Sequence, residues 1–299
     1  YRSSIQTGVG FGSLRYIGVE QETDAATLAC ELKTKFPFIV KTDIGRFFDN
    51  INRNDAKSAL RSVVRHRSLL PILYQIVDAE IVGDSTTRKK LEKGGIRRGL
   101  GIRQGMPLSP LLAHIVLKEF DEFTINSNIK IIRYVDDILI LSDSAIGVER
   151  DFTEVRNWLR EERDLTVAPI GQGKTSQYGP EETFEFLGIK IFKAPDGSWC
   201  RGVPDGLFQR IKERVEERIP ADQSGLKPRS VTSALAFLSS MRESYIAAYG
   251  GLAGWRKIDY KISELEAYAI KRFARLVAPL AQRDASITSE IRKAFSLKP

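Results

Sequence analysis

The stretches FIVKTDIGRFFDNI (38–51) and IKIIRYVDDILILS (129–142) together decide the fold of this chain. The first opens with apolar, largely β-branched residues and reaches a carboxylate at Asp43, which predicts a buried strand over 36–43. The second has two apolar runs separated by RYVDD. It therefore predicts a strand–turn–strand hairpin whose tip carries Asp136 and Asp137.

The sequence around these two stretches completes an α+β pattern. Apolar residues at helical spacing predict helices over 55–66, 68–81, 109–123 and 147–163, and apolar runs predict further strands over 165–169 and 183–192. The basic, glycine-rich segment 86–101 predicts a loop or a twisted hairpin. The resulting order of strands and helices is βαββαβ, and in such a sheet Asp43 would lie beside the hairpin tip.

The last third of the chain has a different character. From Asp205 onward the apolar residues keep a helical period, and 17 Lys and Arg stand against 11 Asp and Glu in a chain of net charge +8. We therefore expect two domains, a mixed α/β region over 1–204 and a basic helical region over 205–299. The basic region could contact a phosphate backbone, or it could be an ordinary solvated helical face. The chain opens at Tyr1 without a methionine, so we expect residues upstream to be missing.

Several classes of protein are excluded by composition. Cys30 and Cys200 are too few for a disulfide framework. No apolar run approaches the roughly 20 residues of a membrane span, and no secretory pattern is present. We expect a cytoplasmic protein with no membrane partner.

The three aspartates predict a metal site. Carboxylates that converge on one point repel each other unless a cation lies between them, and hard oxygen ligands with open positions suit Mg²⁺. Two such ions could support phosphoryl transfer. Asp43 alone would more often be a solvated charge, and YVDD alone is a short motif, so the expectation depends on their combination with the intervening QGMPLSP (104–110).

The ordered motifs resemble those of reverse transcriptases: FIVKTDIGRFFDNI, RQGMPLSPLLAHIVL (103–117), YVDD (134–137), GKTS (173–176) and FLG (186–188). The resemblance implies a right-hand polymerase with fingers and palm over 1–204 and a helical thumb over 205–299. It implies an RNA-directed DNA polymerase, a nucleotidyltransferase that adds dNTPs to a primer 3′-hydroxyl with two Mg²⁺ ions, Mn²⁺ being an alternative.

The resemblance also assigns residues. Asp43, Asp136 and Asp137 would be the catalytic metal ligands, with the Ile44 carbonyl as a further ligand. Nucleotide binding would fall to Phe48 as the ribose gate, Gln104, Gly105 and Lys174, the last neutralising or protonating the departing pyrophosphate. Phe186, Leu187 and Gly188 would form the primer grip, which positions the primer end. The neighbouring Phe47 could take the role of Phe48, and Arg2 or Arg15 could bind the triphosphate.

The resemblance points to a bacterial enzyme of an anti-phage or retroelement system that uses a dedicated non-coding RNA as template and a DNA or RNA primer. A stand-alone reverse transcriptase of anti-phage defence is favoured over a retron or group II intron type, because Val135 stands where those types usually carry Ala. Oligomeric state is left open.

Three other functions stay open. A viral-type RNA polymerase shares the paired aspartates but is expected to have a polar residue in place of Phe48. A non-catalytic RNA-binding scaffold with a polymerase fold would be expected to lack a carboxylate. A template-independent or protein-primed DNA polymerase could use one of the tyrosines of the basic region, namely Tyr245, Tyr249, Tyr260 and Tyr268.

Overall fold

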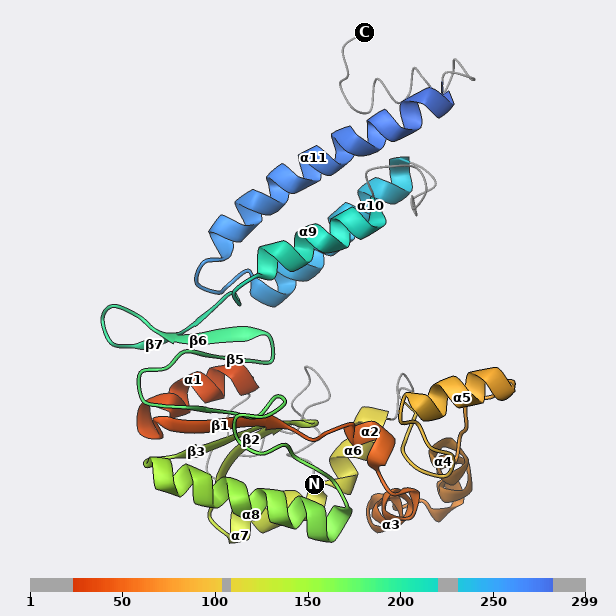
Figure 1. Cartoon of the computed structure of the whole chain (residues 1–299), viewed down its shortest axis with the longest axis vertical. Coiled ribbons are helices and arrows are strands. Elements are labelled where there is room, and N and C mark those ends of the chain that lie inside the picture. The colour runs from red at the N-terminus through yellow and green to blue at the C-terminus, as the bar shows by residue number, and fades with distance from the viewer. Residues whose placement is uncertain (1–23, 104–108, 220–230, 282–299) are drawn as a thin grey trace. The chain divides into compact units, whose positions relative to one another are not determined.

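The computed structural model describes residues 24–103, 109–219 and 231–281 (Figure 1). These residues belong to two compact units. The first runs to Leu187 and includes Lys193–Trp199, and the second comprises Gly188–Phe192 and the chain from Cys200 onward. The chain therefore passes from one unit to the other three times, after Leu187, Phe192 and Trp199.

A four-stranded antiparallel sheet forms the centre of the first unit. Its order is β2-β3-β1-β4, with β1 (Phe38–Asp43) and β3 (Asp137–Ser142) side by side in the middle. The edge strands are β2 (Lys130–Tyr134) and β4 (Ser176–Tyr178). The predicted strand ending at Asp43 and the predicted hairpin are both confirmed.

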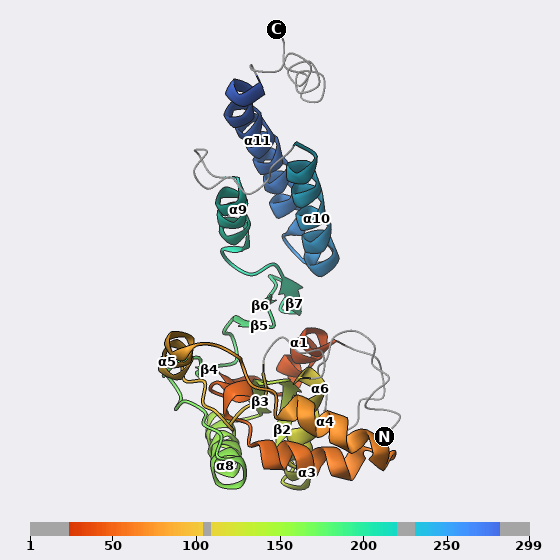
Figure 2. The same cartoon turned by 90° about the vertical axis from the view of Figure 1, so that its right-hand side faces the viewer.

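Side chains of β1 alternate between the two faces of this sheet. Val40 faces the main core with Ile138 and Ile140 of β3, where α8 (Ala145–Arg163) packs against both strands. Successive side chains of a strand point to opposite faces, so Lys41 and Asp43 lie on the other face. Helix α1 (Ala25–Lys35) covers part of that face, opposite α8 (Figures 1 and 2).

Short helices connect β1 to β2. They are α2 (Phe47–Asn50), α3 (Arg53–Val63), the 3-10 turn η1 (Arg67–Leu69), α4 (Leu70–Val77), α5 (Ser85–Lys93), α6 (Ser109–Val116) and α7 (Lys118–Asn126). Helix α3 is capped by Asn52, whose side chain accepts from the backbone N–H of Asn54 at 2.8 Å. Most of the sequence between β1 and β2 is thus helical.

Residues 86–101 do not form the predicted loop or hairpin, because α5 occupies their first half. The Asp84 side chain caps α5 by accepting from Thr87, and Lys90 and Lys93 lie in its last turn, where cations favour the helix dipole. The glycines of this segment act only after the helix, at Gly94 and beyond. The prediction gave those glycines too much weight and overlooked the cap.

Three further boundaries differ from the prediction. Leu117 divides the predicted helix 109–123 into α6 and α7. Segment 165–169 contributes only an isolated bridge, Ile44–Val167, because residues 176–178 occupy the place beside β1 as β4. The predicted strand 183–192 is broken by a turn at Leu187 and Gly188, both with positive φ, into β5 (Phe184–Phe186) and β6 (Ile189–Lys193).

The C-terminal part of the chain is helical, as the periodicity predicts. After β7 (Trp199–Gly202), which completes a second sheet in the order β5-β6-β7, come α9 (Leu207–Arg218), α10 (Val231–Tyr249) and α11 (Trp255–Ala281). Helix α11 packs against both α9 and α10 around Ile211, Leu238 and Ile262 (Figure 2). Among the described residues no helix is both long and apolar enough to cross a bilayer.

Candidate functional site

Two acidic residues face each other at the end of the central strands. In the antiparallel register of β1 and β3, Asp43 is directly opposite Asp137. Side chains of such a pair point to the same face, with Cβ atoms about 4.5–5.5 Å apart. The pairing therefore places two carboxylates side by side on the face of the sheet opposite α8.

The turn between β2 and β3 carries the third carboxylate. Val135 has a φ of 57°, which is costly for a β-branched residue. Two hydrogen bonds hold this turn: Arg133 Nη1 donates to the carbonyl oxygen of Val135 at 3.0 Å, and the Ile44 N–H donates to the carbonyl oxygen of Asp136 at 3.1 Å. The second bond ties the turn to the segment that follows Asp43.

Arg133 is itself fixed by a buried ion pair. Its guanidinium donates to both carboxylate oxygens of Asp121 on α7, at 2.8 and 2.6 Å, and the two side chains are only 1% and 2% exposed. A bidentate pair of this kind is geometrically specific. Sequence analysis missed both residues, although an arginine inside an apolar strand is a signal that a buried acid must be nearby.

The acidic site favours a cation. Burial raises the pKa of Asp136, and the charge of Asp43 raises it further. Burial likewise raises the pKa of Asp137, with a second contribution from Asp136. Three carboxylates with these mutual repulsions are stabilised by any positive charge placed among them.

Lys174 supplies such a charge in this structure. Its Nζ lies 2.6 Å from Oδ2 of Asp43, and this hydrogen bond raises the pKa of Lys174. The lysine side chain is 77% exposed, so the pair contributes little to stability. The structure thus brings Lys174 to the aspartates, as expected for a residue that acts in the same site.

The donor set suits Mg²⁺ held partly by substrate. Within the described ranges, no three His, Cys, Asp or Glu side chains converge as a ready-made metal cage. Mg²⁺ usually keeps several waters and is bound through one or two carboxylates plus substrate phosphates. Asp43 and Asp137, with Asp136 at the adjoining turn, fit that mode of binding.

The remaining predicted nucleotide contacts are only partly visible. Phe47 is buried in the core and Phe48 is half-buried, their rings 5.5 Å apart, so Phe48 is the more accessible of the two aromatic residues. Gln104 and Gly105 lie outside the described residues, as do Arg2 and Arg15. Of the proposed primer grip, Phe186 is fully buried, and Leu187 and Gly188 form the turn after it.

The tyrosines considered for protein priming fall into two groups. Tyr245 and Tyr249 stack on each other, with ring centroids 6.2 Å apart, and both pack against the core of the helical unit. Tyr260 and Tyr268 are 67% and 56% exposed. The second pair is therefore the more accessible, although the Tyr260 hydroxyl bonds to Glu264, which raises the pKa of Tyr260.

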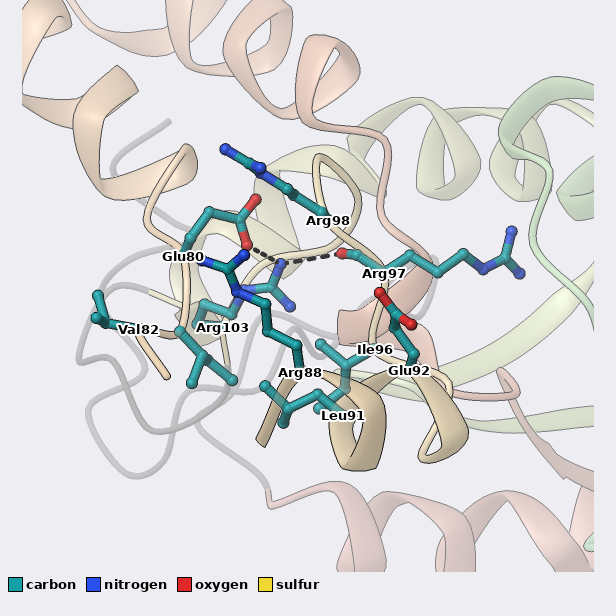
Figure 3. A pocket seen from close by; sticks show the side chains of 10 residues that line it. Glu80, Val82, Arg88, Leu91, Glu92, Ile96, Arg97, Arg98 and Arg103 are labelled. Atoms are coloured by element: carbon teal, nitrogen blue, oxygen red, sulfur yellow. Dashed lines mark hydrogen bonds and ion pairs between the residues drawn. The ribbon is translucent and has the colours of Figure 1, made fainter. Parts of the chain in front are cut away.

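A basic pocket lies in the segment between β1 and α6. It has a volume of about 290 Å³, and Arg88, Arg97 and Arg98 line it with several apolar side chains (Figure 3). Glu80 at its edge binds Arg103 at 2.9 Å and Arg53 at 2.8 Å. A hydrogen bond from the Gly99 N–H, together with these two arginines, lowers the pKa of Glu80. Glu80 is thus bound by two buried arginines, Arg53 and Arg103. The other three, Arg88, Arg97 and Arg98, are exposed to solvent, and we call them the outer arginines.

Comparisons with known proteins agree with this geometry. The family model described as "Reverse transcriptase (RNA-dependent DNA polymerase)" matches residues 11–191, more than half of the chain. A curated relative, the retrovirus-related Pol polyprotein from type-1 retrotransposable element R2 of Nasonia vitripennis, is 27% identical over 180 residues. The match covers 52% of this chain and 17% of that polyprotein, so the chain spans a small part of the relative.

Solved structures of telomerase also resemble the chain. Apo telomerase from Candida tropicalis is 11% identical with a TM-score of 0.48, covering 90% of this chain and 54% of that one. Telomerase from Candida albicans, in complex with a fragment of telomeric RNA, is 14% identical with a TM-score of 0.39, covering 92% and 54%. The family match and the mixed helix-and-sheet architecture give the chain the α+β fold of a right-hand polymerase.

Proposed function

Because this chain belongs to the reverse transcriptase family, we propose that it copies RNA into DNA by adding dNTPs to the 3′-hydroxyl of a primer. The observation that carries the proposal is the pairing of Asp43 with Asp137, beside Asp136, on the face of the four-stranded sheet opposite α8. Carboxylates in this arrangement are what a phosphoryl-transfer site requires.

Each residue of the site has a proposed task. Asp43, Asp136, Asp137 and the Ile44 carbonyl hold two Mg²⁺ ions, which Mn²⁺ could replace. The bound metal supplies charge stabilisation at the attacking and leaving oxygens. Lys174, which already donates to Asp43, neutralises or protonates the pyrophosphate as it departs. A raised lysine pKa keeps this side chain protonated at neutral pH.

Selection of the substrate is assigned to neighbouring residues. The ring of Phe48 excludes a ribose 2′-hydroxyl sterically, and Gln104 and Gly105 contact the incoming nucleotide. Phe186, Leu187 and Gly188 hold the primer end. Most of the acceleration would come from positioning the 3′-hydroxyl and from electrostatic stabilisation rather than from a protein base.

The template is proposed to bind along basic surfaces. The outer arginines of the pocket in Figure 3, Arg88, Arg97 and Arg98, supply charges that a phosphate backbone could use. The basic helices from Leu207 onward are proposed as the thumb, which would contact the primer–template duplex.

The biological role we propose is copying of a cognate non-coding RNA in the bacterial cytoplasm, within an anti-phage or retroelement system. A retron or group II intron type is the alternative subclass. The nucleic acid that co-purifies with an Asp136→Ala/Asp137→Ala variant distinguishes these proposals from general RNA copying. We expect one dominant transcript, and a broad sample of cellular RNA would contradict a dedicated template.

Primer extension tests the activity itself. The wild type is supplied with an RNA template, a DNA primer, Mg²⁺ and either dNTPs or rNTPs, beside the Asp136→Ala/Asp137→Ala variant. An Asp143→Ala variant is the matched control, because Asp143 is exposed just beyond β3. The proposal is supported if the wild type and the control both extend the primer with dNTPs and the Asp136→Ala/Asp137→Ala variant does not.

Other outcomes would replace it. Preference for rNTPs would indicate an RNA polymerase. DNA joined covalently to the protein, and lost in a Tyr260→Phe or Tyr268→Phe variant, would indicate protein priming. Tight RNA binding without extension from any primer would indicate a scaffold.

A further inference from the structure

Lys41 lies two residues before Asp43 on β1 and therefore on the same face of the sheet. Its Nζ donates to the carbonyl oxygen of Glu185 at 2.6 Å, a contact between residues 144 positions apart. Glu185 is the middle residue of β5 and directly precedes Phe186. One side chain thus joins the strand of the first aspartate to the strand that leads into the proposed primer grip.

No ladder of the four-stranded sheet holds β5. That sheet has the order β2-β3-β1-β4, and β5 belongs to the second sheet with β6 and β7. The hydrogen bond from Lys41 to the Glu185 carbonyl therefore links β5 to β1 without a ladder between the two strands. A charge-assisted hydrogen bond from an ammonium to a carbonyl is shorter and stronger than a neutral one.

A second lysine holds the segment just before β5. Lys33 of α1 is 1% exposed, and its Nζ donates to the carbonyl oxygens of Pro37 and Gly179, both at 2.6 Å. The same ammonium lies 5.0 Å from the ring centroid of Trp199 and 5.7 Å from that of Phe184, the first residue of β5. A cation over two aromatic faces is attracted to both.

The charge of Lys41 also reaches the acidic site. Its ammonium opposes the effect of burial on the pKa of Asp137, which places it within electrostatic range of that carboxylate. Lys41 therefore stands between a proposed metal ligand and the backbone of β5. Lys33, on α1, instead holds the segment that precedes β5, through the Gly179 carbonyl.

We propose that Lys41 is a positioning residue for polymerisation: it fixes β5, and with it Phe186 and Leu187, at a set distance from the aspartates. Lys33 provides the second anchor of the same segment. This inference rests on the proposed function, because it takes the turn after Phe186 to be the part that holds the primer end. Misplacement of a reacting atom by about 1 Å can cost on the order of 100-fold in rate.

The test replaces Lys41 by methionine, which keeps the apolar stem and removes the ammonium, and by arginine, which keeps a cationic donor. Lys193→Met is the matched control, because Lys193 makes an exposed ion pair with Glu181 near the same segment at 2.7 Å. Exposed pairs of this kind contribute little. Asp136→Asn serves as the inactive reference.

Single-turnover extension separates positioning from binding. We expect Lys41→Met to lower the rate of nucleotide addition by roughly 10- to 100-fold, with primer–template affinity and melting temperature near those of the wild type. Lys41→Arg recovers most of the rate, and Lys193→Met leaves it unchanged. A Lys41→Met rate equal to that of Lys193→Met, while Asp136→Asn is inactive, overturns the inference and leaves the proposed function intact.

Hydrogen exchange gives a readout that does not need activity. Backbone amides of 184–187 are expected to exchange faster in Lys41→Met than in the wild type or in Lys193→Met. Unchanged exchange would show that Lys41 does not fix β5 and would refute the inference. Failure of the wild type to extend any primer would instead refute the proposed function. The hydrogen-exchange result would still decide whether Lys41 fixes β5.

Discussion

Replacing Asp121 by leucine removes the partner of a fully buried arginine. Arg133 makes two hydrogen bonds to Asp121, at 2.8 and 2.6 Å, and neither side chain is more than 2% exposed. Removing one partner of a buried ion pair leaves the other charge buried without a counter-charge, which lowers the free energy of unfolding by about 3–5 kcal/mol. For a unit of this size each kcal/mol lowers the melting temperature by about 2–4 °C, so we expect a drop of roughly 6–20 °C.

Thermal unfolding followed by circular dichroism measures the drop, and Glu122→Gln is the control. Glu122 pairs with Lys118 on the same helix at 3.0 Å, with both side chains partly exposed, so its loss should cost at most about 0.5 kcal/mol. The double variant Asp121→Leu/Arg133→Met should recover much of the stability, because no charge is then left unpaired. A single Asp121→Leu variant as stable as Glu122→Gln would refute the reasoning.

The double variant also separates stability from activity. It lacks the bond from Arg133 to the Val135 carbonyl, at 3.0 Å, which supports the turn before Asp136. We therefore expect a folded protein that extends primers more slowly than the wild type. Full activity in the stable double variant would show that this bond is not needed to place Asp136 and Asp137.

Three further predictions concern the site and its surroundings. Phe48→Ala should raise the use of rNTPs relative to dNTPs by about tenfold or more, measured by competitive incorporation, whereas Phe47→Ala should cost about 3–5 kcal/mol of stability because that ring is buried. Burial raises the pKa of Asp137, so the stability that this carboxyl contributes is present at low pH and is lost as pH rises through the raised pKa. Asp137→Asn should therefore raise the melting temperature of the metal-free protein at pH 7 but not at about pH 3. A lower melting temperature of the variant at pH 7 would contradict this prediction. Arg97→Ala/Arg98→Ala should reduce the log–log salt slope of single-stranded RNA binding by about 1.4, and an unchanged slope would exclude the pocket from the interface.

Much of the site could be predicted because its motifs are local. The apolar run before Asp43 and the two runs around YVDD each identify a strand by composition alone. Antiparallel pairing of these strands then brings Asp43 opposite Asp137. Lys174 could be assigned only by resemblance, since a lone lysine in a glycine-rich stretch is ordinarily solvated.

The features that the sequence did not reveal depend on contacts between distant segments. Arg133 and Asp121 are twelve positions apart on a strand and a helix, and nothing in the sequence pairs the one with the other. Lys41 bonds to a backbone carbonyl, which every residue possesses, so its partner at Glu185 leaves no trace in the sequence. Segment 165–169 has strand composition, yet only Val167 pairs because β4 occupies the neighbouring position on β1.

Iron-directed cleavage tests most directly whether the aspartates at the ends of β1 and β3 hold the catalytic metal ions. Fe²⁺ in place of Mg²⁺, with primer–template bound and with ascorbate and peroxide added, cuts the backbone wherever the metal sits. We predict cuts near residues 43–44 and 136–137 in the wild type and in Asp143→Asn, and their loss in Asp136→Asn. Cuts elsewhere in the chain, or cuts that persist in Asp136→Asn, would contradict the assignment.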